Sequence, residues 1–117
     1  MSVLFLEYPK CTTCKKAKAW LETNGVAFAD RHIAEETPTA AELKVWWEKS
    51  GLPLKKFFNT SGLLYKEQNL KEKLPQMTED EQLALLATNG MLVKRPLVIG
   101  EDFVLVGFKE AEWERLK

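Results

Sequence analysis

The chain has 117 residues, of which 45% are hydrophobic and 10% aromatic, and this size and composition are typical of a folded domain rather than of a disordered chain. We therefore expect residues 1–117 to form one domain. Lys plus Arg and Asp plus Glu number 17 each, so the formal net charge is zero. Direct binding of nucleic acid, which normally requires a basic excess, is not expected.

The first third of the chain predicts a βαβ unit. Residues 1–8 have the apolar character of a short buried strand, which Pro9 ends. Residues 11–24 are rich in helix formers, and Gly25 suits the end of that helix. Residues 27–33 form a second candidate strand. This order favours two parallel strands joined by a right-handed crossover.

The middle of the chain predicts helices. Thr39 with Glu42, and Thr78 with Glu81, have the spacing of capping boxes that begin helices. Pro75 is expected to end the helix that precedes it. The sequence predicts helical segments over residues 39–51, 54–58, 65–74 and 78–89.

The last part of the chain returns to strands. Residues 97–99 and 103–106 read as a β-hairpin with a short turn, and residues 110–116 as a terminal helix. The predicted fold class is therefore α/β. We expect a four-stranded mixed sheet with flanking helices and a helical insertion between strands 2 and 3.

Several features favour a cytoplasmic location. No apolar run approaches the roughly 18 residues that a membrane-spanning helix needs, and no membrane association is expected. Residues 1–8 lack the basic start and small-residue cleavage site of a signal peptide. Two cysteines are too few for a disulfide-stapled secreted scaffold.

The motif that predicts chemistry is Cys11-Thr12-Thr13-Cys14, placed where the first strand passes into the first helix. A cysteine at a helix N-terminus faces unpaired backbone N–H groups and the positive end of the helix dipole, which favour the thiolate. Cys11 is therefore the expected nucleophile. Cys14 lies one turn later, close enough to resolve a mixed disulfide formed at Cys11.

Two other interpretations of the cysteine pair are open. A structural zinc site needs four ligands, whereas His32 is the only other soft ligand in the chain, so zinc is a poor fit and no metal is expected. His32 itself is expected to be a partly exposed strand residue. The remaining alternative is two ordinary buried cysteines. The position after a strand, inside a βαβ unit, favours a redox pair.

Lys94-Arg95-Pro96-Leu97 leads into the third predicted strand. Pro is tolerated at the start of a strand, often in a cis bond at a functional turn. The guanidinium of Arg95 matches oxyanions in a bidentate manner, which makes it a candidate anion-holding group beside a thiolate.

Together these segments resemble the arsenate reductase (ArsC)/Spx family across the whole chain. The segments that carry the resemblance are Tyr8-Pro9-Lys10-Cys11-Thr12-Thr13-Cys14-Lys15-Lys16-Ala17, Phe57-Phe58-Asn59-Thr60-Ser61-Gly62, Lys94-Arg95-Pro96-Leu97-Val98 and Val106-Gly107-Phe108. The resemblance implies a thioredoxin-like fold with a helical insertion, in agreement with the predicted element order.

The resemblance also implies site residues. Cys11 matches the cysteine with which arsenate reductases attack arsenate, and Arg95 matches one of their three oxyanion-holding arginines. The other two positions are occupied by Asn59 and Gly107, and Glu7 replaces a histidine. Each lost charge-assisted hydrogen bond removes about 1.5–3 kcal/mol. A carboxylate directed at the site would repel arsenate and raise the Cys11 pKa. We therefore expect any reduction of arsenate to be inefficient.

Two functions follow as hypotheses. In the first, the chain is a thiol-disulfide oxidoreductase in which Cys11 attacks and Cys14 resolves. Arg95 and the backbone amides of Thr12 and Thr13 would stabilise anions, and Pro96 would shape the substrate groove. Thioredoxin, or glutathione with glutaredoxin, would supply electrons, and no bound cofactor is implied.

The second hypothesis comes from the Spx branch of the family. Spx proteins are redox-switched transcriptional regulators that bind the RNA polymerase α subunit, with the CxxC pair as the switch. By this resemblance the chain would bind that subunit rather than turn over a substrate.

Overall fold

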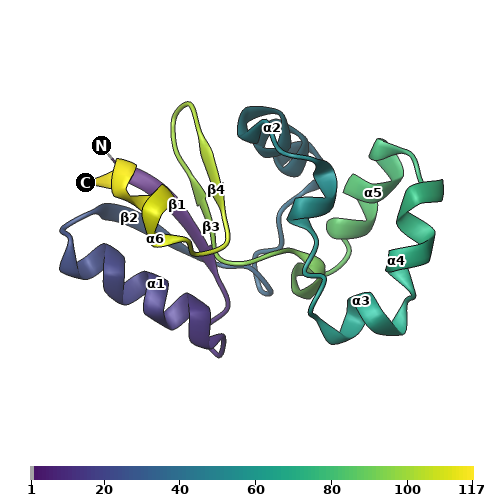
Figure 1. Cartoon of the computed structure of the whole chain (residues 1–117), viewed down its shortest axis with the longest axis horizontal. Helices are drawn as coiled ribbons and strands as arrows, with labels where there is room; N and C mark the ends of the chain where they lie inside the picture. The colour runs from purple at the N-terminus through teal and green to yellow at the C-terminus, as the bar shows by residue number, and fades with distance from the viewer. Residues whose placement is uncertain (1) are drawn as a thin grey trace.

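The computed structural model describes residues 2–117, and the chain follows the predicted order of elements (Figure 1). The strands are β1 (Ser2–Glu7), β2 (Ala27–His32), β3 (Leu97–Ile99) and β4 (Val104–Val106). The α-helices are α1 (Thr12–Thr23), α2 (Ala40–Ser50), α3 (Leu63–Glu67), α4 (Leu70–Lys73), α5 (Glu79–Leu86) and α6 (Glu110–Trp113). Short 3₁₀ helices are η1 (Leu54–Phe57), η2 (Leu74–Gln76), η3 (Gly90–Leu92) and η4 (Glu114–Leu116).

The four strands form one mixed sheet in the order β2-β1-β3-β4. β1 and β2 are parallel, with Ser2 opposite Ala27 and Glu7 opposite His32. β3 pairs antiparallel with both β1 and β4. The predicted mixed sheet, with the helical insertion between β2 and β3, is confirmed.

Successive side chains of each strand point to opposite faces of the sheet, and a hydrophobic core forms on each face. Val3 and Phe5 of β1 pack with Ala17 and Leu21 of α1 and with Trp113 of α6. On the opposite face, Leu6 of β1 and Leu97 of β3 pack with the apolar side chains of the insertion. This division follows from the period of two in a strand, which sends successive side chains to opposite faces.

The insertion α2–α5 gathers to the right of the sheet in Figure 1, away from α1. Both predicted capping boxes are present: Thr39 and Glu42 begin α2, and Thr78 and Glu81 begin α5, with reciprocal hydrogen bonds in each. The two boxes therefore mark these helix starts correctly, since each satisfies backbone N–H groups that the helix leaves free.

The predicted continuous helix over residues 65–74 is wrong. The chain breaks at Asn69, whose φ of 53° and ψ of 43° place it in the left-handed region. Asn adopts this conformation more readily than other non-glycine residues, so α3 ends before it and α4 starts after it. Pro75 does not stop the helix either; it lies inside η2, because the first turn of a helix tolerates a missing N–H.

None of the helices in residues 2–117 has both the length and the apolarity needed to cross a membrane.

Candidate active site

Cys11 is placed by the turn that joins β1 to α1. Its backbone N–H donates to the Tyr8 carbonyl at 2.9 Å, and its own carbonyl accepts from Lys15 N–H at 3.0 Å. With φ −81° and ψ 120° it is the N-cap of α1, and its Sγ accepts from the Cys14 N–H at 3.4 Å. The sulfur therefore occupies the position in which a capping oxygen usually satisfies a free helix N–H.

This position lowers the pKa of the Cys11 thiol from its usual 9.0. Burial acts in the opposite direction and is the largest single influence. It is outweighed by hydrogen bonds from the Cys14 side chain and backbone, by the charge of Arg95, and by the Thr13 backbone N–H. The prediction that Cys11 is the low-pKa thiol agrees with this direction.

Cys14 has the opposite character. Its side chain is fully buried, and burial raises its pKa to about 12 despite a hydrogen bond from the Tyr8 backbone. Both cysteines are free thiols. One turn of helix thus carries one thiol that ionises readily and one that is held protonated at neutral pH.

Arg95 presents an unused guanidinium beside this pair. Its Nε and Nη1 atoms are buried and find no hydrogen-bond partner within residues 2–117, and its Cζ lies 5.3 Å from the Tyr8 ring centroid. Buried donors without partners are costly, and an anion near Cys11 would satisfy them. Pro96, joined to Arg95 by a cis bond, is buried, and its carbonyl accepts from Gly107 N–H at 2.9 Å.

The side chains of Thr12 and Thr13 are exposed in the first turn of α1. The Thr13 backbone N–H acts on the Cys11 sulfur, whereas no hydrogen bond from Thr12 to that sulfur is present among residues 2–117. His32 is partly exposed at the end of β2, as predicted, and stacks edge-on against Tyr8 at 5.7 Å.

The two positions at which the resemblance implies an arginine in arsenate reductases carry no cationic side chain in this protein. Asn59 lies in the loop before α3, where its side chain closes over Gly62. Gly107 has φ 78°, and its carbonyl accepts from Trp113 Nε1 at 3.1 Å. Arg95 is the predicted anion-binding side chain that the structure brings to the cysteines.

Glu7 takes a position that sequence reasoning did not anticipate. It is 5% exposed, and its Oε2 lies 3.7 Å from Lys18 Nζ, which is 2.9 Å from Asp30 Oδ2. Burial and the neighbouring Asp30 raise the pKa of Glu7 to about 7. The Cys11 pKa is lowered, and Glu7 is not among the main influences on it. The sequence signal that could have indicated this buried position is a single acidic residue at the end of an otherwise apolar strand.

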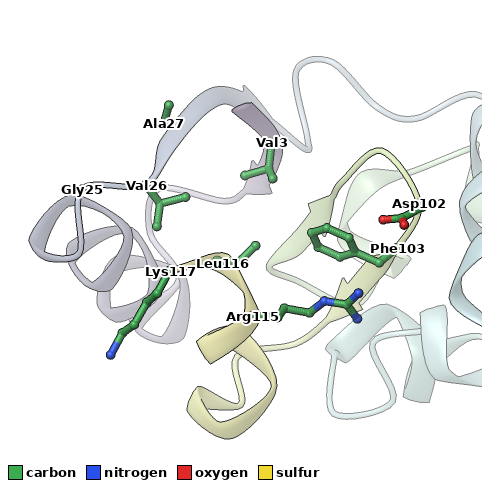
Figure 2. A pocket seen from close by; sticks show the side chains of 9 residues that line it. All are labelled: Val3, Gly25, Val26, Ala27, Asp102, Phe103, Arg115, Leu116 and Lys117. Carbon is green, nitrogen blue, oxygen red and sulfur yellow. The ribbon is translucent and has the colours of Figure 1, made fainter. Parts of the chain in front are cut away.

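A pocket of about 570 Å³ lies away from the cysteine pair (Figure 2). It is bounded by Val3 at the start of β1, Ala27 at the start of β2, and the Phe103 and Arg115 side chains. Because β1 and β2 are parallel, their first residues lie at the same end of the sheet. The cysteine pair, which follows the last residue of β1, lies at the opposite end.

Within residues 2–117 no group of three or more His, Cys, Asp or Glu side chains is arranged to hold a metal ion.

A mixed β2-β1-β3-β4 sheet with a cysteine pair at the β1–α1 junction defines a thioredoxin-like α/β protein with a CxxC motif. A family model narrows this class: ArsC matches residues 6–116. The chain belongs to the ArsC family.

The relatives of the chain include regulatory proteins. YusI of Bacillus subtilis is 60% identical over 97% of each chain. The regulatory protein MgsR of the same organism is 32% identical over 96% of this chain and 87% of its own. The global transcriptional regulator Spx of Enterococcus faecalis is 31% identical over 92% of this chain and 80% of its own.

Solved structures agree on the fold. An ArsC family related protein from Bacteroides fragilis superposes with a TM-score of 0.97 at 63% identity, covering 100% of this chain and 98% of its own. An arsenate reductase from Vibrio cholerae gives a TM-score of 0.88 at 28% identity, with the same coverage. The predicted thioredoxin-like fold is confirmed, and the family contains both enzymes and regulators.

Proposed function

We propose that this protein is a dithiol oxidoreductase of the ArsC family, with Cys11 as the nucleophile and Cys14 as the resolving thiol. The observation that carries the proposal is the contrast between two thiols one helical turn apart. Cys11 is partly exposed with a lowered pKa, whereas Cys14 is buried with a pKa of about 12. Attack needs a thiolate that solvent can reach, and resolution needs a second thiol shielded from outside reagents.

The proposed reaction consists of two successive thiol–disulfide exchanges. The Cys11 thiolate attacks one sulfur of a substrate disulfide, which forms a mixed disulfide and releases the other sulfur as a thiolate. Cys14 then loses its proton and attacks the Cys11 sulfur, which releases the second substrate thiol and leaves a Cys11–Cys14 disulfide. Thioredoxin, or glutathione with glutaredoxin, reduces that disulfide and completes the cycle in the cytoplasm.

Arg95 is proposed to hold the anionic part of the substrate. Its Nε and Nη1 atoms are buried without partners in residues 2–117, and its charge acts on the Cys11 sulfur. The backbone of Thr12 and Thr13 would add N–H donors, and Pro96 would form one wall of the groove. With one guanidinium at the site, we expect disulfides to be better substrates than arsenate.

The test is NADPH consumption in thioredoxin- and glutaredoxin-coupled assays, with a small disulfide and arsenate as parallel substrates. We expect disulfide turnover that is abolished in Cys11→Ser, while Cys14→Ser accumulates a mixed disulfide visible by mass spectrometry. Full turnover by Cys14→Ser would contradict the dithiol mechanism. Efficient arsenate turnover would show that one guanidinium and the helix N-terminus suffice.

A redox-switched regulator is the second candidate, favoured by the similarity to MgsR and Spx. In this case formation of the Cys11–Cys14 disulfide would alter a surface that binds the RNA polymerase α subunit. A pull-down with that subunit, under oxidising and reducing conditions, separates the candidates. Binding that changes with redox state would support the regulator, and equal failure in both states would reject it.

A further inference from the structure

Lys94 is a cation to which the exchange reaction above gives no role. Its side chain is half-buried and forms no ion pair with a carboxylate of residues 2–117. Its Cε, the carbon that carries the ammonium, lies 3.4 Å from the point at which a Cβ on Gly107 would stand. The Lys94 side chain therefore lies along the backbone of Gly107, where no side chain competes for the space.

Strand pairing places Gly107 at the same end of the sheet as Cys11. Leu97 of β3 pairs antiparallel with Leu6 of β1 on one side and with Val106 of β4 on the other. β1 and β4 therefore run in the same direction, and both finish at one end of the sheet. Gly107 directly follows β4 and Cys11 lies in the turn after β1, so the ammonium of Lys94 is at the cysteine end of the sheet.

The backbone around Lys94 is held by the segment before α3. The Lys94 N–H donates to the Phe57 carbonyl at 2.8 Å, and Val93 forms an antiparallel β-bridge with Phe58. The side chains of Phe57, Phe58 and Val93 are buried. Lys94 thus extends from an anchored backbone, which limits the positions that its ammonium can reach.

Arg95 places a second cation next to the first in the sequence and close to the turn that carries Cys11. Its Cζ is 5.3 Å from the ring centroid of Tyr8, whose carbonyl accepts from the Cys11 N–H at 2.9 Å. The buried Nε and Nη1 atoms of Arg95 have no partner in the described part of the chain. Unpaired buried donors of a cation favour an anionic ligand at this site.

The carboxylates of the strands do not neutralise these two cations. The described strands carry two acidic residues, Glu7 and Asp30. Glu7 Oε2 and Asp30 Oδ2 lie 3.7 and 2.9 Å from the Nζ atom of Lys18. Within residues 2–117 no carboxylate forms an ion pair with Lys94 or Arg95. The positive charge at this end of the sheet is therefore available to a ligand.

We propose that Lys94 is a specificity-determining residue that binds a carboxylate of the substrate, so that the protein prefers disulfides bearing carboxylates to neutral or cationic ones. The inference rests on the proposed thiol–disulfide exchange and names its substrate class. The Cys11 thiolate attacks one sulfur of a disulfide R–S–S–R, the mixed disulfide Cys11–S–S–R forms, and the other half leaves as R–S⁻. Arg95 acts beside the reacting sulfur, and Lys94 binds the carboxylate of R.

The two cations have separable effects. The charge of Arg95 is among the main influences that lower the pKa of Cys11, and Lys94 is not among them. Lys94 therefore changes which disulfide is preferred without changing how readily Cys11 ionises. An ammonium on a flexible stem suits this role, because it acts as a point charge that can follow a carboxylate at slightly different positions.

Small disulfides of different charge test the proposal. Dithiodipropionate is anionic, hydroxyethyl disulfide is neutral and cystamine is cationic at neutral pH. In Cys14→Ser the exchange stops at the mixed disulfide, so mass spectrometry of acid-quenched samples gives the rate constant for attack by Cys11 on each disulfide. Dividing each rate constant by its value in Cys14→Ser alone cancels the intrinsic reactivities of the disulfides.

Adding Lys94→Gln should slow the reaction with dithiodipropionate and accelerate that with cystamine, while hydroxyethyl disulfide reacts as before. We expect the preference for the anionic over the cationic disulfide to fall about fivefold at low ionic strength. Lys94→Arg keeps the charge and should retain the preference.

The matched control is Lys44→Gln, which removes the same charge from an exposed position on α2. In Figure 1 α2 is at the top, whereas α1 begins at the bottom, and the rate constants should not change. Unchanged rate constants in Lys94→Gln would overturn the inference while the exchange chemistry stands. An equal change with all three disulfides would also overturn it, because Lys94 would then act on Cys11 or on the fold. The lack of a Cys11 adduct with any disulfide would reject the proposed function itself.

Discussion

The guanidinium of Arg95 and the ring of Tyr8 lie against each other, with Arg95 Cζ 5.3 Å from the ring centroid. Tyr8 precedes Cys11 in the β1–α1 turn, and its carbonyl accepts from the Cys11 N–H at 2.9 Å. The contact therefore joins the segment that enters β3 to the turn that carries Cys11. Through this contact, two segments that are far apart in the sequence contribute to the same candidate site.

Replacing Arg95 with Ala should raise the pKa of Cys11, because a positive charge that favours the thiolate is lost. We also expect disulfide turnover to fall about tenfold or more, since a charge-assisted hydrogen bond contributes about 1.5–3 kcal/mol. The pH dependence of iodoacetamide alkylation measures the pKa shift. Arg115→Ala is the matched control, because Arg115 also stacks on an aromatic ring, that of Phe103, at the opposite end of the sheet. Equal pKa shifts in both variants would contradict a local effect.

The two thiols should differ sharply in reactivity. In the folded protein at neutral pH, iodoacetamide should label Cys11 and leave Cys14 unlabelled, because Cys14 is buried with a pKa of about 12. Mass spectrometry of tryptic peptides identifies the labelled site. After denaturation both cysteines should react at similar rates. Comparable labelling of Cys14 in the folded protein would contradict the described burial.

Glu7 should make the protein less stable as pH rises. Its pKa increases from 4.5 to about 7 on folding, so the folded state binds the proton more tightly than the unfolded state. The stabilisation is complete below about pH 4.5 and disappears as pH rises through about 7. In Glu7→Gln this slope should be absent, and the variant should be more stable than the wild type in mildly alkaline buffer by about 1–3 kcal/mol. Urea denaturation across this pH range tests the prediction. A parallel slope in the variant would contradict it.

Glu42 should act in the opposite direction. Arg31 Nη1 and Nη2 donate to its two carboxylate oxygens at 2.8 and 3.0 Å, and this pairing lowers the pKa of Glu42 to about 2. Its stabilisation is complete above about pH 4.5 and is lost as pH falls toward about 2. We expect Glu42→Gln to lose about 1 kcal/mol at neutral pH, a value reduced for solvent screening. Glu48→Gln, an exposed acid on the same helix, should change stability little. A similar loss in both variants would indicate a general effect of charge on α2.

Local patterns in the sequence predicted much of the fold and the proposed nucleophile. The strand–helix–strand order, the two capping boxes and the terminal hairpin depend on neighbouring residues, since periodicity, caps and turns act over a few positions. The place of Cys11 at a helix start follows from the same local signals. The break at Asn69 was missed because the apolar spacing over residues 65–74 is equally compatible with one helix or two.

The tertiary structure decided what surrounds the cysteines. Burial of Cys14, the approach of Arg95 to Tyr8, and the position of Glu7 below α1 all arise when β1, α1 and β3 pack together. The sequence alone determined the order of the elements and which residues are proposed to carry the chemistry. Which thiol ionises, and which carboxylate holds a proton, depends on desolvation and on charges brought close from distant segments.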